Sequence, residues 1–151
     1  MREILFRAKR KNWSNLPKNE WWVEGIPIEI KDKMYMAVNY VDCEQITDFE
    51  MSQYILRKSF VEIDPETLCQ YTGKSDEDGK KIFEGDIAGF IDLYSTESGY
   101  SEHSCVGEVV WDKEECCFHV TNRLSAESWE VLDECKVVGN VFDDKELLEE
   151  F

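Results

Sequence analysis

The sequence predicts a mainly β protein with a small barrel from about residue 65 onward. Short apolar and aromatic runs recur at close spacing, and turns rich in Gly and Asp separate them. The chain has 151 residues, which is long enough to bury a core without a disulfide or a metal ion. Although 33% of the residues are charged, 5 Trp, 6 Tyr and 8 Phe favour a packed interior over disorder.

Residues 1–63 predict a β-rich segment that precedes the barrel. Gly25 and Pro27 are expected to end the second strand of this segment, because both residues weaken a β ladder. Residues 44–58 fit a short helix about as well as a strand. The expected strands cover residues 4–8, 21–24 and 35–41.

Residues 64–151 predict the barrel domain itself. Asp64 and Pro65 begin it with a turn or helical start, since aspartate caps a helix and proline fixes its own φ. Asp78 and Gly79 predict a tight hairpin turn with positive φ. Strands are expected at residues 87–93, 106–111, 116–120 and 137–142, a second turn at 84–86, a long exposed polar loop at 95–104, and a short helix at 143–151.

The net charge of −16 is concentrated in the second half of the chain. Residues 1–75 carry a net −1, whereas residues 76–151 carry a net −15. This balance excludes a nucleic acid held through its phosphates, because such binding needs clustered Lys and Arg. The acids alternate with apolar residues, so we interpret them as the solvated face of folded strands, with an interaction surface as the alternative.

One dense cationic cluster lies near the N-terminus. It consists of Arg7, Lys9, Arg10 and Lys11. We interpret it as a solvated surface, or as a partner of the acidic half in the same or a neighbouring subunit.

The sequence predicts a soluble, cytoplasmic protein. Arg and Lys interrupt the first eleven residues, so they lack the apolar core of a secretory signal. No apolar run reaches the ~18–20 residues that a membrane helix needs. Reduced thiols are therefore expected for the six cysteines, which are Cys43, Cys69, Cys105, Cys116, Cys117 and Cys135.

The centre and both ends of the chain resemble the YopX family of small proteins encoded by bacteriophages and prophages. The resemblance rests on residues 64–73, Asp76 and 78–87 at the centre, and on 2–8, 107–111 and 137–143 toward the ends. Cys69 stands where the family often has Gly, Ser75 adds a polar residue to the turn, and residues 12–60 and 94–105 align poorly. The resemblance implies an SH3-like barrel in the C-terminal part, assembly as a homo-oligomer in the bacterial cytoplasm, and no established activity.

The sequence contains no clear nucleophile and base. His103 lies in the predicted polar loop, where a solvated imidazole is expected. In the predicted strand at 116–120, Cys116 is expected to share a face with Phe118, while Cys117 and His119 occupy the other face. Glu84 and Asp86 are interpreted as turn-forming residues. We therefore predict no catalytic residue.

No metal or cofactor is predicted either. Cys105, Cys116, Cys117 and His119 are four soft ligands in number, but they lack the Cys-x-x-Cys spacing of a zinc site. Residues 76–79 resemble part of a calcium loop. Lys74 and Gly85 would then occupy its first and twelfth positions, where carboxylates are required.

Three functions remain open at this point. The favoured one is a non-catalytic, oligomeric protein-binding module that binds a host or phage protein, with Trp111 or Trp129 as an exposed anchor. The second is an acidic mimic of nucleic acid that occupies a host DNA-binding protein. The least favoured is an enzyme that uses carboxylates on a small barrel.

Overall fold

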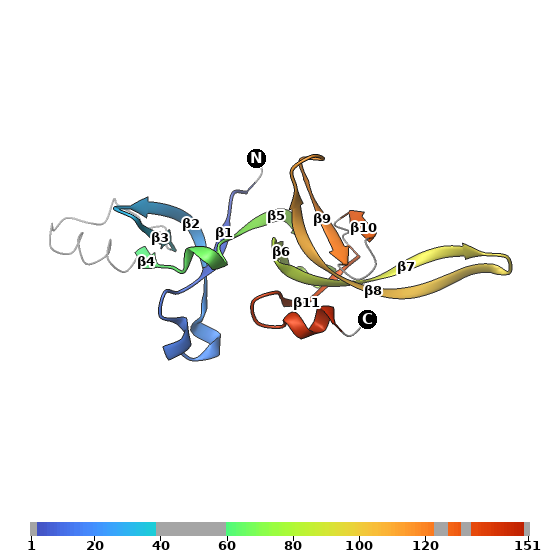
Figure 1. The fold of residues 1–151 in the computed structure, drawn as a ribbon, viewed down its shortest axis with the longest axis horizontal. Helices are drawn as coiled ribbons and strands as arrows, with labels where there is room; N and C mark the ends of the chain where they lie inside the picture. The colour runs from blue at the N-terminus through green and yellow to red at the C-terminus, as the bar shows by residue number, and fades with distance from the viewer. Residues whose placement is uncertain (1–2, 39–59, 123–126, 131–133, 150–151) are drawn as a thin grey trace. The chain divides into compact units, whose positions relative to one another are not determined.

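The computed structural model describes residues 3–38, 60–122, 127–130 and 134–149, with the side chains of Tyr94 and of residues 127–130 left out. The predicted mainly β class is confirmed, because the strands form antiparallel sheets and the helices are short 3-10 turns (Figure 1). The chain divides into two compact units, Met1–Gln70 and Tyr71–Phe151. The predicted segment at 44–58 lies outside the described residues.

The N-terminal unit contains four strands that pair in the order β4-β3-β2-β1. These are β1 (Phe6–Lys9), β2 (Trp22–Ile30), β3 (Lys33–Ala37) and β4 (Phe60–Glu62). Two 3-10 helices, η1 (Trp13–Asn15) and η2 (Lys18–Glu20), connect β1 to β2. The core of this unit consists of Ala8, Val23, Met36 and Ile63.

Strand β2 does not end at Gly25 and Pro27, as the sequence had predicted, but continues to Ile30. Its pairing with β1 stops at Gly25, so Pro27 is paired on one side only, with Met36 of β3. Proline has no N–H group, so it cannot donate a hydrogen bond to a neighbouring strand. Pro27 is tolerated within β2 because the strand has a partner on one side only at this position. A Cβ atom at Gly25 would collide with the Ala37 carbonyl, so this glycine allows a close backbone approach rather than ending the strand.

Strand β5 (Cys69–Ser75) passes from one unit to the other. Cys69 pairs with β1, while Tyr71 pairs with β6 (Lys81–Phe83). The helical start predicted before it is confirmed as η4 (Pro65–Thr67), where the Asp64 side chain accepts a hydrogen bond from the Glu66 N–H at 3.1 Å.

The C-terminal unit is built on a five-stranded antiparallel sheet with the order β10-β9-β8-β7-β11. Its strands are β7 (Asp86–Thr96), β8 (Gly99–Asp112), β9 (Cys117–Asn122), β10 (Glu127–Glu130) and β11 (Lys136–Asn140). The core of this unit consists of Ile82, Ala88, Phe90, Cys105, Val109, Val120, Cys135 and Val137. The hairpin turn predicted before β6 is confirmed, since Gly79 has a φ of +81°.

This sheet does not close into a barrel within the described residues, because β10 and β11 remain its two edges. The N–H of Val137 in β11 donates to the Asp76 carboxylate at 3.0 Å, and the Cys135 carbonyl accepts from the N–H of Glu77 at 3.0 Å. Residues 76–77 are thus hydrogen-bonded to the chain at the start of β11 without forming a strand beside it. The SH3-like character of the unit stays a prediction.

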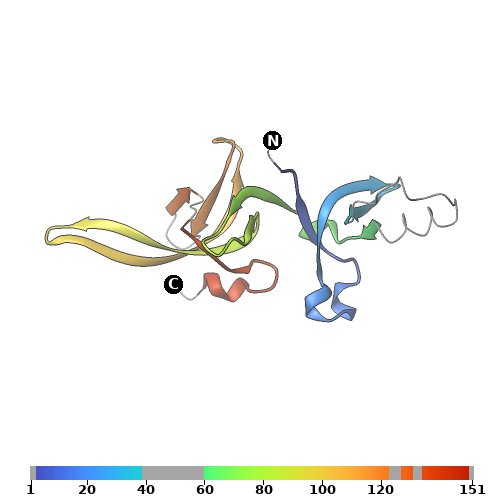
Figure 2. The same cartoon turned by 180° about the vertical axis from the view of Figure 1, so that it is seen from behind.

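Residues 95–104 form no loop, which corrects the prediction from their small polar side chains. Apart from the two-residue turn at 97–98, they belong to β7 and β8, which pair continuously from Ile87 and Glu108 to Thr96 and Gly99. Figures 1 and 2 show this hairpin projecting beyond the other strands of its unit. Both faces of its outer part contact solvent, so its sequence lacks the apolar alternation of a strand that covers a core.

Two further boundaries differ from the prediction. The last strand ends at Asn140 rather than at residue 142, because the Asn140 side chain accepts hydrogen bonds from the N–H groups of Phe142 and Asp143, at 3.0 Å each. The predicted C-terminal helix is present as a single 3-10 turn, η5 (Lys145–Leu148).

Candidate functional site

The outer part of the β7–β8 hairpin, residues 90–105, has two open edges and is called the arm below. The pairing of β7 with β11 reaches only as far as Gly89. The pairing of β8 with β9 reaches only as far as Glu108. Along the arm, each strand therefore pairs only with the other among the described residues. Such edges offer backbone donors and acceptors to a further strand.

One face of the arm carries large apolar side chains in solvent. Residues directly opposite in an antiparallel pair share a face, and the register places Ile91 opposite Ser104, Leu93 opposite Glu102 and Tyr100 opposite Ser95. Ile91 is 59% exposed, Leu93 63% and Tyr100 84%. Contiguous exposed apolar residues of this kind are typical of interaction surfaces.

The apolar face continues into an open groove of about 560 Å³ at the base of the arm. Ile91 belongs both to the face and to the groove, and Val138, which is 47% exposed, also lines the groove. Glu77 and Glu134 supply acidic groups to the lining, and Lys136 supplies a basic one. The groove thus combines an apolar lining with two acidic groups and one basic group.

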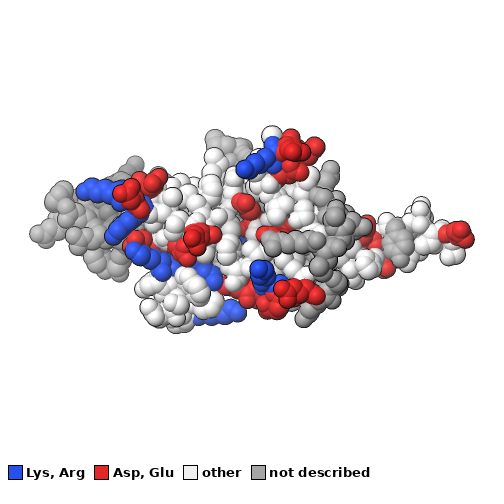
Figure 3. Space-filling model, in the orientation of Figure 1, with Lys and Arg blue, Asp and Glu red and all other residues white. Residues whose placement is uncertain are grey.

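The hairpin carries negative charge only. The sequence has no Lys or Arg between Lys81 and Lys113, but it has seven acids in that interval. In the view of Figure 3 the projecting hairpin accordingly shows red side chains and no blue ones. Basic partner groups are attracted to such a surface, and acidic ones are repelled.

The two tryptophans predicted as partner anchors lie on the neighbouring strands. Trp111 of β8 is 43% exposed, and its ring lies 5.0 Å from that of Phe118, edge to face. Trp129 pairs with Val120 through the backbone of β10, but its side chain lies outside the described residues. Their role in binding stays a prediction.

A second cluster joins three side chains at the opposite end of β8. Cys117 Sγ lies 3.1 Å from Nε2 of His119, and Nδ1 of His119 lies 3.3 Å from Oδ2 of Asp112. The expected shared face of Cys117 and His119 is confirmed. Cys116, however, lies in the preceding turn with a φ of +54° and not on the strand.

Asp112 is the member of this cluster that the sequence analysis missed. Its Oδ1 accepts hydrogen bonds from the N–H groups of Glu115 at 3.1 Å and Glu114 at 2.9 Å, which lowers the pKa of this carboxyl below its usual value. His119 adds a smaller effect in the same direction. The sequence contains a signal for this position. An aspartate directly before a four-residue hairpin turn lies opposite the first residue of the next strand, here Cys117.

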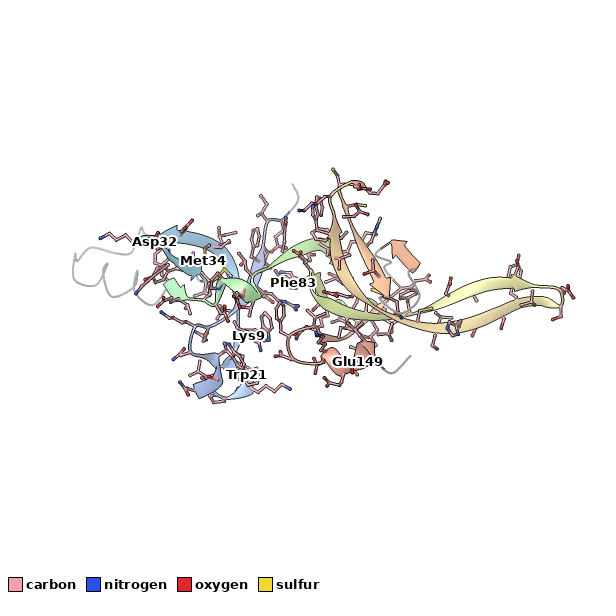
Figure 4. The ribbon with its side chains drawn as sticks, viewed as in Figure 1. Lys9, Trp21, Asp32, Met34, Phe83 and Glu149 are labelled. Carbon is pink, nitrogen blue, oxygen red and sulfur yellow. The ribbon has the colours of Figure 1, made fainter. Side chains whose placement is uncertain are left out.

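Of the predicted cationic cluster, Lys9 is buried, whereas Arg7 and Arg10 are half-buried and Lys11 is exposed. Lys9 is 2% exposed, and its Nζ lies 3.8 Å from the ring centre of Trp13, 4.7 Å from that of Trp21 and 5.5 Å from that of Trp22. Figure 4 shows Lys9 next to Trp21. Of its neighbours in the cluster, Lys11 pairs with Glu62 at 3.0 Å within the same unit.

The remaining candidates have structural contacts. Asp86 is 1% exposed, and its Oδ2 accepts a hydrogen bond from the N–H of Phe83 at 2.8 Å, as expected for a turn-forming residue. His103 lies on the arm opposite Asp92, and Cys105 is buried opposite Phe90. In the part of the chain that the structure describes, no group of three or more His, Cys, Asp or Glu is arranged to hold a metal ion.

The described helices are too short and too polar to cross a membrane. The fold defines an all-β protein of antiparallel sheets, with an acidic arm that exposes an apolar face. The chain belongs to the YopX family, whose YopX protein profile matches residues 6–149. A comparison with curated proteins gives no significant match.

Proposed function

We propose that this YopX-family chain is a non-catalytic protein-binding module, in which the arm holds an extended, basic segment of a host or phage protein. The observation that carries the proposal is the exposed face formed by Ile91, Leu93 and Tyr100 on a hairpin without Lys or Arg. Apolar side chains of the partner would fill the groove, and its Lys and Arg would meet the acids around it.

The open edges of the arm favour an extended partner over a helical one. A strand added to β7 beyond Gly89 would continue the sheet where β11 leaves it. Main-chain hydrogen bonds would then supply affinity, while alternate side chains of the segment would reach the apolar face. A two-stranded ribbon is marginally stable in water, so a third strand would also stabilise the arm.

Charge argues against a second copy of this chain as the occupant of the arm. The arm contains Asp92, Glu97 and Glu102 and neither Lys nor Arg, so two arms side by side would repel one another. The homo-oligomer implied by the family would then form through another surface. Sedimentation of the purified chain and of an arm variant separates these cases, because an arm variant that loses self-association would contradict the proposal.

The proposal predicts that Ile91→Ser with Leu93→Ser weakens binding of a basic peptide. The probe is a fluorescein-labelled peptide of about twelve residues in which Lys alternates with Val or Leu, and anisotropy gives its Kd. We expect the double variant to raise this Kd by at least about tenfold, since two apolar contacts at the centre of the interface are lost. A peptide with Glu in place of each Lys is expected not to bind.

The matched control is Ile26→Ser with Ile30→Ser, which removes two exposed isoleucines from β2 of the N-terminal unit. This variant is expected to bind the basic peptide like the unmodified chain. Equal weakening by both double variants, or binding of the acidic peptide, would refute the assignment to the arm.

A second candidate function is an acidic mimic of nucleic acid that occupies a host DNA-binding protein. The net charge of −15 over residues 76–151 supports it. A mimic acts through charge alone, so its binding falls steeply with salt and is indifferent to the apolar face. Salt-sensitive peptide binding that survives Ile91→Ser with Leu93→Ser would favour the mimic over the arm.

A further inference from the structure

The cluster of Cys117, His119 and Asp112 has the order of a nucleophile, a base and an orienting carboxylate. Each nitrogen of the imidazole faces a different partner, with the thiol at Nε2 and the carboxylate at Nδ1. A carboxylate at Nδ1 favours the tautomer with its proton on that atom, which leaves Nε2 able to accept a proton. This site lies at the far end of β8 from the arm and does not depend on the proposed binding function.

The β8–β9 hairpin fixes this alignment through its register. Asp112 is directly opposite Cys117, and His119 lies two residues further along β9 on the same face. The N–H groups of Glu114 and Glu115 hold Oδ1 of Asp112, so its Oδ2 is directed at the histidine. The three groups are therefore positioned by backbone pairing as well as by their own contacts.

We propose that Cys117 is a nucleophilic thiol and a site of modification by small disulfides. His119 accepts the proton of the Cys117 thiol at Nε2, and the thiolate attacks one sulfur of the disulfide. The S–S bond of the reagent breaks as the new S–S bond to Cys117 forms. The released thiolate takes up the proton from His119 and leaves as a thiol. The cysteine is oxidised, and the reagent is reduced.

The surroundings of the thiol select the charge of the reagent. The side chain of His119 is 20% exposed and that of Asp112 is 32% exposed, so the site is open to small molecules only. Asp112 at the end of β8 and Glu114 and Glu115 in the turn place three acids near Cys117, against one basic residue, Lys113. Neutral or cationic disulfides are therefore favoured, and anionic ones such as oxidised glutathione are repelled.

The test compares two adjacent cysteines. Cys116 is exposed in the turn, and its Sγ donates to the Lys113 carbonyl at 3.5 Å, so it serves as the reference thiol. In Cys116→Ser the rate of Cys117 with cystamine is measured at neutral pH by peptide mapping with mass spectrometry. In Cys117→Ser the rate of Cys116 is measured likewise. We expect Cys117 to react at least about tenfold faster than Cys116, although it is less exposed.

Two variants test the histidine and the carboxylate in the Cys116→Ser chain. His119→Gln is expected to slow the reaction of Cys117 with cystamine about tenfold, because no base then accepts the thiol proton. Asp112→Asn keeps an oxygen for the turn but presents an amide donor to Nδ1, so it is expected to slow the reaction while the chain stays folded.

The ratio of rates for cystamine and oxidised glutathione supplies an independent readout of the acidic turn, and we expect cystamine to be faster. A Cys117 rate that does not exceed that of Cys116 would overturn the proposal, as would an unchanged rate in His119→Gln. The comparison of the two cysteines holds even where His119→Gln unfolds the hairpin, because both chains in it retain His119.

Discussion

Replacing Asp76 with alanine is expected to lower the free energy of unfolding of the C-terminal unit by about 3 kcal/mol, because three backbone donors lose a charged acceptor. Asp76 is 6% exposed. Its Oδ1 accepts from the N–H groups of Asp78 at 3.0 Å and Lys80 at 2.8 Å, and its Oδ2 accepts from Val137 at 3.0 Å. Urea unfolding followed by circular dichroism measures the change.

The matched control for this prediction is Asp78→Ala in the same turn. The Asp78 side chain is 60% exposed and faces Lys136 at 3.4 Å. Asp78→Ala is expected to lower the free energy of unfolding by less than about 0.5 kcal/mol, because an exposed ion pair is screened by solvent. An equal decrease in the free energy of unfolding for the two alanine variants would show that the buried hydrogen bonds of Asp76 stabilise the unit no more than the exposed ion pair of Asp78 does.

The same carboxylate makes stability depend on pH. The N–H of Val137 does most to hold the pKa of Asp76 below its usual value, against the opposing effect of burial, and the N–H groups of Lys80 and Asp78 add to it. A group whose pKa is lowered by folding stabilises the protein above its unfolded pKa of about 3.9, and this stabilisation is lost as the pH falls through the folded value. Asp76→Asn is therefore expected to lose less stability than the unmodified chain between about pH 5 and pH 2.

Replacing Lys9 with alanine is expected to lower the free energy of unfolding of the N-terminal unit by about 3 kcal/mol. The substitution leaves a cavity among three indole rings and removes the cation–π attraction. Trp13, Trp21 and Trp22 all lie within 5.5 Å of the ammonium group, measured to their ring centres. Urea unfolding followed by tryptophan fluorescence measures the change in a chain that carries Trp111→Phe and Trp129→Phe, because the remaining tryptophans all lie in this unit.

Two comparisons show which part of Lys9 contributes. Lys11→Ala removes a lysine that is 61% exposed and pairs with Glu62 at the surface, so a cost below about 1 kcal/mol is expected. Lys9→Met fills the same space without a buried charge and is expected to recover more than half of the loss. A Lys9→Met chain as unstable as Lys9→Ala would instead mean that the ammonium group dominates.

Local signals in the sequence predicted the turns well. The cap at Asp64 and the positive φ at Gly79 are fixed by the chemistry of a few adjacent residues. The inner part of the arm was predicted as a strand at 87–93, but residues 95–104 were predicted as a loop because their small polar side chains show no apolar alternation. Pro27 was misread because a single sequence does not show on how many sides a strand is paired.

The site residues depend on pairing between strands, which periodicity does not reveal. Lys9 reaches the tryptophans because β1 places it opposite Trp22. Asp112 reaches His119 because the β8–β9 turn returns the chain in one particular register. Sequence reasoning identified the histidine and the cysteine as a pair on one face, but the third member came from the facing strand.

The absence of Lys and Arg along the arm determines how proteases cleave it. A protease that cleaves after Lys and Arg has no target from Ile82 to Asp112, so it releases the whole β7–β8 hairpin as one fragment even from unfolded chain. A protease that cleaves after Glu finds Glu97 at the tip and Glu102 beside it. Cleavage at these two residues therefore reports directly on whether the arm is covered.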